Sequence, residues 1–546
     1  MKLDSTPVQT LSALAVSIVL AGVARGGDRF HRYLVSPSNE GFFGSPPVGD
    51  VDADGYDDLL LAWRPANWPA SPVHIRVRSG LNATLLYDWP PTPPATTHPL
   101  VGAGAGDLNL DGHADIVLGT QVGIPNTPGS GQVEFRSGAD GSLLGILTVP
   151  SLGWGPFGIA GSRLGAPGDL NGDGFPEVMI GGGPLAQCPG VVVVSAPSFT
   201  PLYTYPPVCG SQFGASLARV EDSDGDGLPE FLIAWLGFPP GGGLGIYSGS
   251  TGALLTSFLG SNPYQGVGQS AFGLGDVNGD GVPEIASVES FLSPTGVGQN
   301  QVVVRTVGTW TPLYVVANPS GDIDRILDAD GDGIDDIMTR SSPLQVFSGA
   351  TGSLLFDLAA WSAPAYPTVL WGATLGDVNG DGLGDIGASA VTIPGFALPP
   401  WSAQDLTWGW TWPPGPPGAL EAWVYTARNL EVVGPTLVGG SAQFDLLVPK
   451  RPGRPFQVVF SLEGQVPGIP LGPFLFPLVP DALFLQTAAM GIGGVLDAMG
   501  RATLTLPIPA NPSLRNHEVK ASGVVYDPAG PLGIGCVLTG ESFMLQ

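Results

Sequence analysis

The chain has 546 residues, of which only 12% are charged, about half the share of an average soluble protein, while glycine and proline together make up about a quarter. A hydrophobic fraction of 43% is too high for a disordered chain, so we expect glycine and proline to separate short apolar strands, and long helices are not expected. The net charge of −27 makes nucleic acids and anionic membrane surfaces poor partners and favours a cation.

The first 26 residues are predicted to be an export signal. Residues 11–24 form an apolar run that ends in small residues suited to cleavage. The alternative is an uncleaved membrane anchor, for which a run of about 14 residues is short. No later segment of the sequence is long and apolar enough to cross a membrane. We therefore expect a mature protein that is secreted or displayed at the cell surface.

The three cysteines do not indicate a metal site. Cys188 and Cys209 have a spacing that allows one disulfide, which would leave Cys536 unpaired. No CxxC pair occurs and the five histidines are scattered, so a zinc site is not expected.

One nine-residue motif, D-x-[DN]-x-D-G-x-x-[DE], occurs seven times, and its copies begin 49 to 62 residues apart. Such a period is typical of one supersecondary unit per repeat. The copies, called loops 1 to 7 below, cover residues 50–58, 107–115, 169–177, 222–230, 276–284, 328–336 and 377–385.

Oxygen-bearing side chains recur at positions 1, 3, 5 and 9 of each loop, as calcium prefers. Position 7 varies, so it can contribute only its backbone carbonyl in every copy. Position 6 is always glycine, which predicts a sharp turn with positive φ. The predicted calcium ligands are Asp50, Asp52, Asp54, Tyr56 and Asp58; Asp107, Asn109, Asp111, His113 and Asp115; Asp169, Asn171, Asp173, Phe175 and Glu177; Asp222, Asp224, Asp226, Leu228 and Glu230; Asp276, Asn278, Asp280, Val282 and Glu284; Asp328, Asp330, Asp332, Ile334 and Asp336; and Asp377, Asn379, Asp381, Leu383 and Asp385.

Two other interpretations of the motif fit less well. An EF-hand loop needs a glutamate at position 12, but no copy has an acid there, and each loop runs into an apolar strand instead of a helix. Asp, Asn and Gly also favour metal-free turns. However, the seven loops hold 24 of the 47 acidic residues at positions 1, 3, 5 and 9, and such crowding is costly without a counterion. Up to seven structural calcium ions are therefore expected.

The segments between the loops predict about four short strands per period. Four of them contain a Ser-Gly-rich hairpin phrase between apolar runs, at residues 77–86, 135–144, 247–255 and 347–355. Small sheets repeated seven times bury both faces when they stack radially. We therefore predict an all-β fold, with a seven-bladed β-propeller over residues 30–428. Residues 33–35 are predicted to form part of a strand that completes the last blade.

The phrase FG-x…GD-x-[DN]-x-DG-x-x-[DE] resembles the FG-GAP repeat of the integrin α-subunit head and of many exported bacterial proteins. The Phe-Gly or Trp-Gly pairs lie at residues 157–158, 213–214, 272–273 and 371–372. The resemblance covers roughly residues 30 to 430. It implies a β-propeller whose loops hold calcium, and it says little about function, because the family includes adhesins, lectin-like modules, scaffolds and catalytic domains.

The last period and the C-terminal region differ from the rest. An insertion rich in tryptophan and proline, residues 392–417, precedes a strand at 418–426. Its four tryptophans either stack on a ligand such as a sugar or pack within the protein. Residues 429–546 contain no motif and alternate apolar strands with turns, which predicts a separate β-sandwich. This region loosely resembles the C-terminal β domains that follow repeats in some exported bacterial proteins.

For function, we expect a non-catalytic binding, adhesion or surface module with an unknown protein or glycan partner. The alternatives are a polysaccharide lyase or hydrolase on a propeller scaffold, and a purely structural cell-envelope protein. The sequence offers no persuasive set of nucleophile, base and orienting residue. Ions that hold blade turns would be fully coordinated, so the expected role of calcium is structural.

Overall fold

The computed structural model describes residues 30–36, 40–42, 47–63, 74–90, 99–120, 131–148, 163–182, 190–206, 211–237, 241–260, 265–292, 298–317, 322–340, 344–357, 368–391, 420–427, 429–433, 436–462, 469–471, 474–476, 478 and 481–546. The expected export signal, Cys188, Cys209 and the tryptophan-rich insertion lie outside these residues. Cys536 is a buried free thiol.

The described residues between 30 and 427 form seven four-stranded antiparallel sheets. Each of the first six contains four consecutive strands, and the last contains β26, β27, β28 and the N-terminal strand β1. In chain order the sheets are β2 (Glu40–Phe42), β3 (Leu59–Trp63), β4 (His74–Arg78) and β5 (Leu85–Trp89); β6 (Pro99–Gly106), β7 (Asp115–Thr120), β8 (Gln132–Arg136) and β9 (Leu143–Thr148); β10 (Arg163–Gly168), β11 (Glu177–Gly181), β12 (Val191–Ser195) and β13 (Thr200–Tyr205); β14 (Ser211–Val220), β15 (Glu230–Gly237), β16 (Gly243–Tyr247) and β17 (Leu254–Leu259); β18 (Gln265–Gly275), β19 (Glu284–Leu292), β20 (Gly298–Thr306) and β21 (Pro312–Ala317); β22 (Ile323–Ile326), β23 (Asp336–Thr339), β24 (Gln345–Phe347) and β25 (Leu354–Asp357); and β26 (Thr368–Gly376), β27 (Asp385–Val391), β28 (Leu420–Ala427) and β1 (Phe30–Ser36).

An apolar strand follows each loop, as the sequence predicts, and the structure shows that it is the second strand of its sheet. β11 is buried along its whole length, whereas the fourth strand of a sheet, such as β17, alternates between exposed and half-buried residues. Adjacent sheets pack face to face: Val117 and Phe135 of the second sheet share a core with Val178 and Val192 of the third. Burying such side chains contributes about 1.5–3 kcal/mol each, so every sheet depends on its neighbours.

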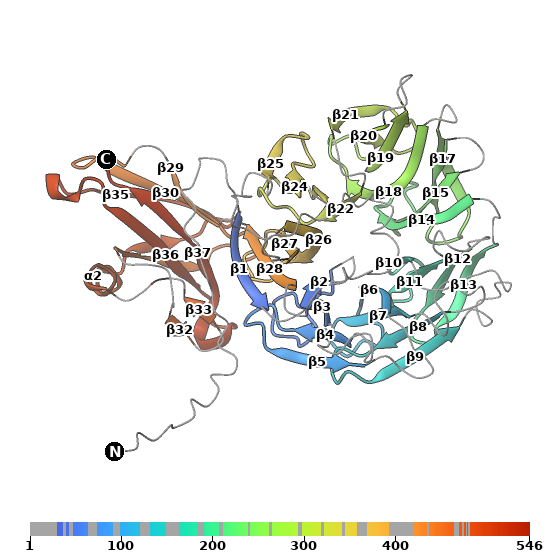
Figure 1. The fold of residues 1–546 in the computed structure, drawn as a ribbon, viewed down its shortest axis with the longest axis horizontal. Helices are drawn as coiled ribbons and strands as arrows, with labels where there is room; N and C mark the ends of the chain where they lie inside the picture. The colour runs from blue at the N-terminus through green and yellow to red at the C-terminus, as the bar shows by residue number, and fades with distance from the viewer. Residues whose placement is uncertain are drawn as a thin grey trace, which may run out of the picture.

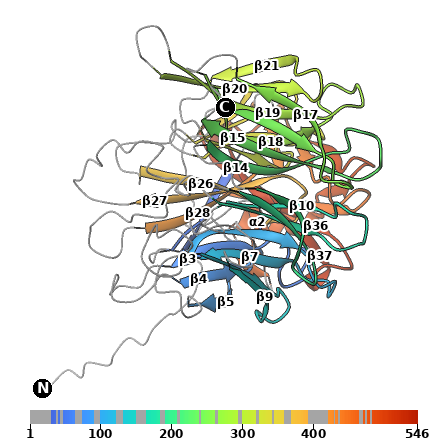
Figure 2. The ribbon, with the colours of Figure 1, turned by 90° about the vertical axis from the view of Figure 1, so that its right-hand side faces the viewer.

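The sheets follow one another around a ring, with the first strand of each nearest the centre (Figure 1). Viewed from the side, the fourth strands β5, β9 and β21 lie at the margins of the ring (Figure 2). β1 pairs antiparallel with β28, so a strand from the start of the chain completes the last sheet, as predicted. β2 contacts β26, β27 and β28, which places the first sheet next to the last.

The C-terminal region has a core of its own. A three-stranded sheet contains β29 (Leu430–Val433), β30 (Ser441–Leu447) and β35 (Arg501–Pro507), and a four-stranded sheet contains β34 (Gly493–Val495), β31 (Pro455–Ser461), β36 (Glu518–Tyr526) and β37 (Ile534–Met544). A short sheet pairs β32 (Ile469–Leu471) with β33 (Phe474–Phe476). Phe444 of β30, Phe460 of β31 and Leu538 of β37 share one cluster, so the two larger sheets bury a common face.

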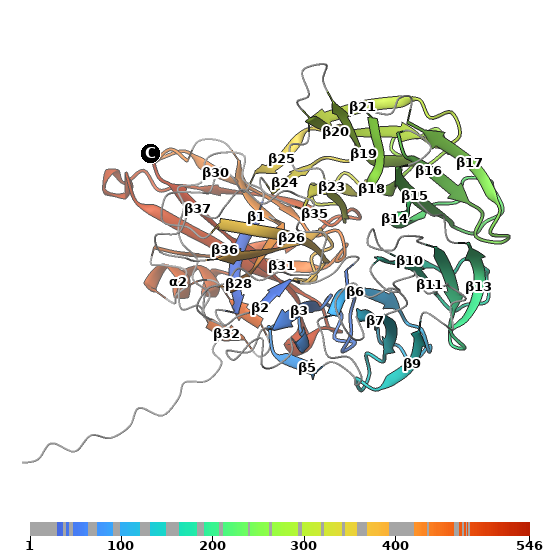
Figure 3. The same ribbon diagram turned by 45° about the vertical axis from the view of Figure 1, so that its right-hand side comes forward.

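This C-terminal region lies on one side of the ring (Figure 3), where Lys450 bonds to Gly55 and Asp377, and Arg501 bonds to Gly331. It contains α2 (Ala482–Met490), which Asp481 caps by accepting a hydrogen bond from the Phe484 N–H at 2.7 Å. Within the described part of the chain, none of the helices combines the length and the hydropathy needed to cross a membrane.

Candidate metal centres

The seven loops share one hydrogen-bond pattern. In each, the N–H of the position-6 glycine donates to the position-1 carboxylate at 2.7–3.0 Å. The N–H of position 7 donates to the position-5 carboxylate at 2.8–3.1 Å. These bonds wrap the backbone around the carboxylates at positions 1 and 5, so acidic oxygens are held on one side of a tight turn.

The glycine at position 6 has the conformation that the sequence predicts, with φ between 85° and 93° in all seven loops. Position 4 is also left-handed, which the sequence analysis missed. It is glycine in five loops, but Ala53 and Leu110 occupy it in loops 1 and 2, both with φ of 58°. The signal was present, since five of the seven copies have glycine there.

Three loops bring carboxylate oxygens together closely enough for one ion. Asp222, Asp224, Asp226 and Glu230 of loop 4 each offer an oxygen within 4.8 Å of the others, and so do three acids of loop 1 and three of loop 6. Calcium–oxygen bonds of about 2.3–2.6 Å allow ligands on opposite sides of an ion to lie about this far apart. These three loops carry Asp at position 3. The other four carry Asn, whose amide oxygen can also bind calcium.

Two of these carboxylates have a buried oxygen without a hydrogen-bond partner, Oδ1 of Asp52 in loop 1 and Oε1 of Glu230 in loop 4. Glu230 is fully buried, and its other oxygen accepts from the N–H of Ser223. An unpaired buried carboxylate oxygen is costly, and a cation among the loop oxygens would satisfy it. The residues therefore fit a divalent ion in these two loops.

Burial shifts the protonation of the loop acids. It raises the pKa of Asp54 to about 6 and the pKa of Glu230 to about 7, and repulsion from neighbouring loop carboxylates adds to the rise. For Asp58 and Asp336 burial raises the pKa to about 8. The ionised forms of Asp58 and Asp336 are thus disfavoured near neutral pH in the metal-free loops, and a bound cation would favour the ionised form of each of these acids.

The acid at position 9 has a second role that the sequence analysis missed. Asp336 accepts from the N–H groups of Ala329 within loop 6 and Gly349 in the following hairpin turn, both at 2.8 Å. Asp58 accepts in the same way from Val51 and Gly80. Loop and hairpin are thereby joined through one buried side chain. The sequence held a signal for this contact, because the Ser-Gly-rich hairpin phrase follows the motif in several periods.

Neighbouring loops also bond to one another. The N–H of Ala114, at position 8 of loop 2, donates to the carbonyl of Asp50 in loop 1 at 2.9 Å, and Gly384 of loop 7 donates to Asp328 of loop 6 at 3.0 Å. The same bond links Asp57 of loop 1 to the carbonyl of Asp377 in loop 7, at 3.0 Å. Loops 3, 4 and 5 have proline at position 8 and lack this donor. The bond between loops 1 and 7 connects the two ends of the repeat series.

The side chains at position 7 point to neighbouring segments. His113 Nδ1 lies 2.8 Å from the carbonyl of Val51 in loop 1. The Tyr56 hydroxyl donates to the carbonyl of Gly535 in the C-terminal region. These two side chains therefore make contacts outside their own loops.

Comparison with known proteins supports the interpretation of the loops as repeats. A family model described as an FG-GAP-like repeat matches residues 50–118, which include loops 1 and 2. A search of curated proteins found no match to the chain. The small antiparallel sheets that recur along the chain agree with the propeller-like architecture that this repeat suggests.

Proposed function

We propose that the chain is an exported, calcium-stabilised β-propeller protein that acts as a non-catalytic binding or surface module. In this proposal residues 30–428 form a seven-bladed propeller and residues 429–546 form a β-sandwich. The FG-GAP-like match, the seven sheets and the pairing of β1 with β28 support the propeller. The core that the two C-terminal sheets share supports the sandwich.

The observation that carries the calcium proposal is the oxygen cluster of loop 4. Four carboxylates converge there, and Oε1 of Glu230 is buried without a partner. Hard divalent cations with several oxygen ligands suit such a group. The shared motif extends the proposal to the other loops that offer the same oxygens to solvent.

The proposed role of calcium is structural. Each loop joins the first and second strands of a sheet, and in loops 1, 2 and 6 the position-9 acid also reaches the hairpin that follows, so an ion at such a loop would hold several segments together. Binding only to the folded form adds about 1–3 kcal/mol per site at ten to a hundred times Kd. Several sites together would rival the stability of a typical domain, about 5–15 kcal/mol.

The proposed partner is a protein or glycan. In the sequence, residues 392–417 connect β27 to β28 and contain Trp401, Trp408, Trp410 and Trp412. Long connections on rigid scaffolds often carry binding function, and indole rings stack on sugars. A glycan array probed with the chain from residue 27 onward tests this. Bound glycans that are lost when these four tryptophans are changed to alanine would support it, and turnover of a bound polysaccharide would contradict a non-catalytic role.

The calcium proposal is tested by counting ions. We expect the purified chain to contain several calcium ions, and chelation with EDTA to lower its melting temperature by many degrees. Glu230→Gln should remove one ion, because an amide supplies a weaker and uncharged ligand. Elemental analysis after dialysis against calcium gives the count, and differential scanning calorimetry gives the stability.

The matched control is Glu289→Gln. Glu289 is equally buried but binds Arg305 at 2.7 Å, outside any loop. This change should reduce stability without changing the ion count. A chain that contains no calcium and melts identically with and without EDTA would disprove the proposal.

A further inference from the structure

Loop 7 differs from the other loops because the C-terminal region covers it. Lys450, in the turn after β30, donates from Nζ to Oδ2 of Asp377 at 3.2 Å and to the carbonyl of Gly55 in loop 1 at 3.0 Å. Its backbone N–H donates to the carbonyl of Asp381 at 3.3 Å. The amide of Asn429 donates from Nδ2 to Oδ2 of Asp381 at 2.9 Å. Asn429, which precedes β29, and Lys450, which follows β30, thus contact the acids at positions 1 and 5 of loop 7.

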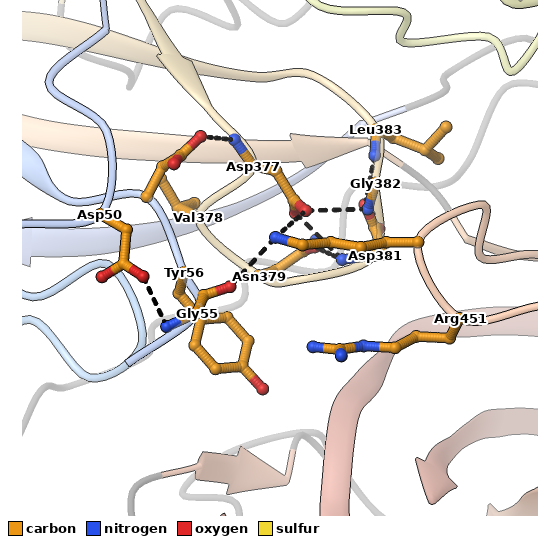
Figure 4. A network of polar contacts seen from close by, with 12 residues as sticks. Asp50, Gly55, Tyr56, Asp377, Val378, Asn379, Asp381, Gly382, Leu383 and Arg451 are labelled. Atoms are coloured by element: carbon orange, nitrogen blue, oxygen red, sulfur yellow. Dashed lines mark hydrogen bonds and ion pairs between the residues drawn. The ribbon is translucent and has the colours of Figure 1, made fainter. Parts of the chain in front are cut away.

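These contacts remove the loop acids from solvent. Asp381 is fully buried and Asp377 is 4% exposed, whereas the aspartates at position 5 of loops 2 to 6 are all exposed. Figure 4 shows Asp377 and Asp381 enclosed between loop 1, where Tyr56 lies, and the segment that carries Arg451. An ion in loop 7 would therefore lack the open side that loops 2 to 6 present to water.

The donors at loop 7 use the oxygens that a divalent ion would need. All seven loops share the bonds from the backbone at positions 6 and 7, but in loop 7 Oδ2 of Asp377 also accepts from the Lys450 ammonium group, and Oδ2 of Asp381 accepts from the Asn429 amide. A second cation beside the ammonium group would be repelled.

The chain approaches loop 7 more closely than a side chain at Gly382 would permit. A Cβ built on Gly382 would lie 2.7 Å from the backbone nitrogen of Lys450. The backbone of Lys450 thus packs closely against loop 7, so the contact between the C-terminal region and this loop does not depend on the lysine side chain alone.

We propose that loop 7 does not bind a divalent ion, and that the ammonium group of Lys450 serves as its cation and docks the C-terminal region on the ring. The residues of this loop do not fit the ion that its motif predicts. The statement that the other loops bind calcium while loop 7 does not rests on the proposed function. The docking of the C-terminal region by Lys450 does not rest on it.

Ion counting in full-length variants tests the proposal. Lys450→Met keeps most of the aliphatic stem and removes the charge, so the variant should bind one calcium ion more than the wild type at saturating calcium. Lys520→Met is the matched control, because Lys520 pairs with Glu518 in the C-terminal region and should leave the count unchanged. Asp381→Asn should remove no ion from the wild type, whereas Asp280→Asn in loop 5 should remove one. An unchanged count in Lys450→Met, or the loss of an ion in Asp381→Asn, would overturn the proposal.

Hydrogen–deuterium exchange gives a readout that does not depend on calcium. In EDTA the peptide covering residues 377–385 should stay protected in the wild type and exchange about tenfold faster in Lys450→Met. Equal exchange in the two proteins would overturn the docking role. If the wild type contains no calcium at all, the proposed function fails while this measurement still decides whether Lys450 docks the C-terminal region.

Discussion

At the scale of single residues, the loops depend on a backbone conformation that glycine adopts most easily. Position 6 is glycine in every copy, but position 4 is Leu110 in loop 2, with φ of 58° and a side chain that is 54% exposed. A left-handed conformation costs an ordinary residue about 1–2 kcal/mol, because Cβ approaches the carbonyl oxygen. Because the Leu110 side chain is mostly exposed, its packing does little to offset this backbone strain.

We therefore expect Leu110→Gly to raise the free energy of unfolding by about 1 kcal/mol, because glycine relieves the backbone strain. The greater conformational entropy of glycine in the unfolded chain offsets part of this gain. Gly279→Ala at the same position of loop 5 is the reverse experiment, since a Cβ there would meet no atom within 4 Å. It should lower stability by a similar amount. Urea denaturation measures both changes, and a destabilised Leu110→Gly would show that position 4 is not strained.

At the scale of elements, the acid at position 9 links a loop to the hairpin of the same sheet. Asp336 accepts hydrogen bonds from Ala329 and Gly349, and both contacts are buried. A buried N–H that loses its acceptor costs about 1–3 kcal/mol. The role is therefore structural whether or not an ion is present in the loop.

Asp336→Ala should accordingly lower stability by about 2–5 kcal/mol, by nearly the same amount in calcium and in EDTA. Asp332→Ala, at the exposed position 5 of the same loop, should lower stability mainly in calcium. Thermal unfolding of both variants under the two conditions separates the roles. If the effect of Asp336→Ala vanished in EDTA, position 9 would act as a metal ligand alone.

At the scale of the whole molecule, a chain of polar contacts holds the C-terminal region to the ring. Arg451 binds Asp527 at 2.9 Å and donates to the carbonyl of Gly535 at 3.1 Å, and the same carbonyl accepts from Tyr56 of loop 1. Arg454 also lies 3.1 Å from Asp527, but it is 42% exposed, so water screens this pair. Asp527 itself is buried.

The contacts of Asp527 predict a dependence on pH. A backbone hydrogen bond from Ala529, with the charges of Arg454 and Arg451, lowers the pKa of Asp527 below its usual value. Because the folded state favours the ionised form, this stabilisation is complete above about pH 4 and is lost as the pH falls through the lowered pKa. Asp527→Asn should cost about 1–3 kcal/mol at pH 7 and less near pH 3. Denaturation curves at the two pH values test this, and an equal cost at both would contradict it.

The sequence by itself determined the features that depend on neighbouring residues. The strand after each loop, the position-6 glycine and the oxygens at positions 1, 3 and 5 follow from a nine-residue pattern, because a tight turn and an apolar strand need only local information. The C-terminal strands β30, β31, β35 and β36 were predictable for the same reason.

Only the tertiary structure decided which distant segments meet. The pairing of β1 with β28, the bonds between Asp57 and Asp377, and the contact of Lys450 with loop 7 each join residues far apart in the chain. In sequence, loop 7 has the same motif as its neighbours, so nothing local separates it from them. Its difference arises because the C-terminal region, which also touches loops 1 and 6, covers the acids of loop 7, where burial and a neighbouring ammonium group change what the same carboxylates can bind.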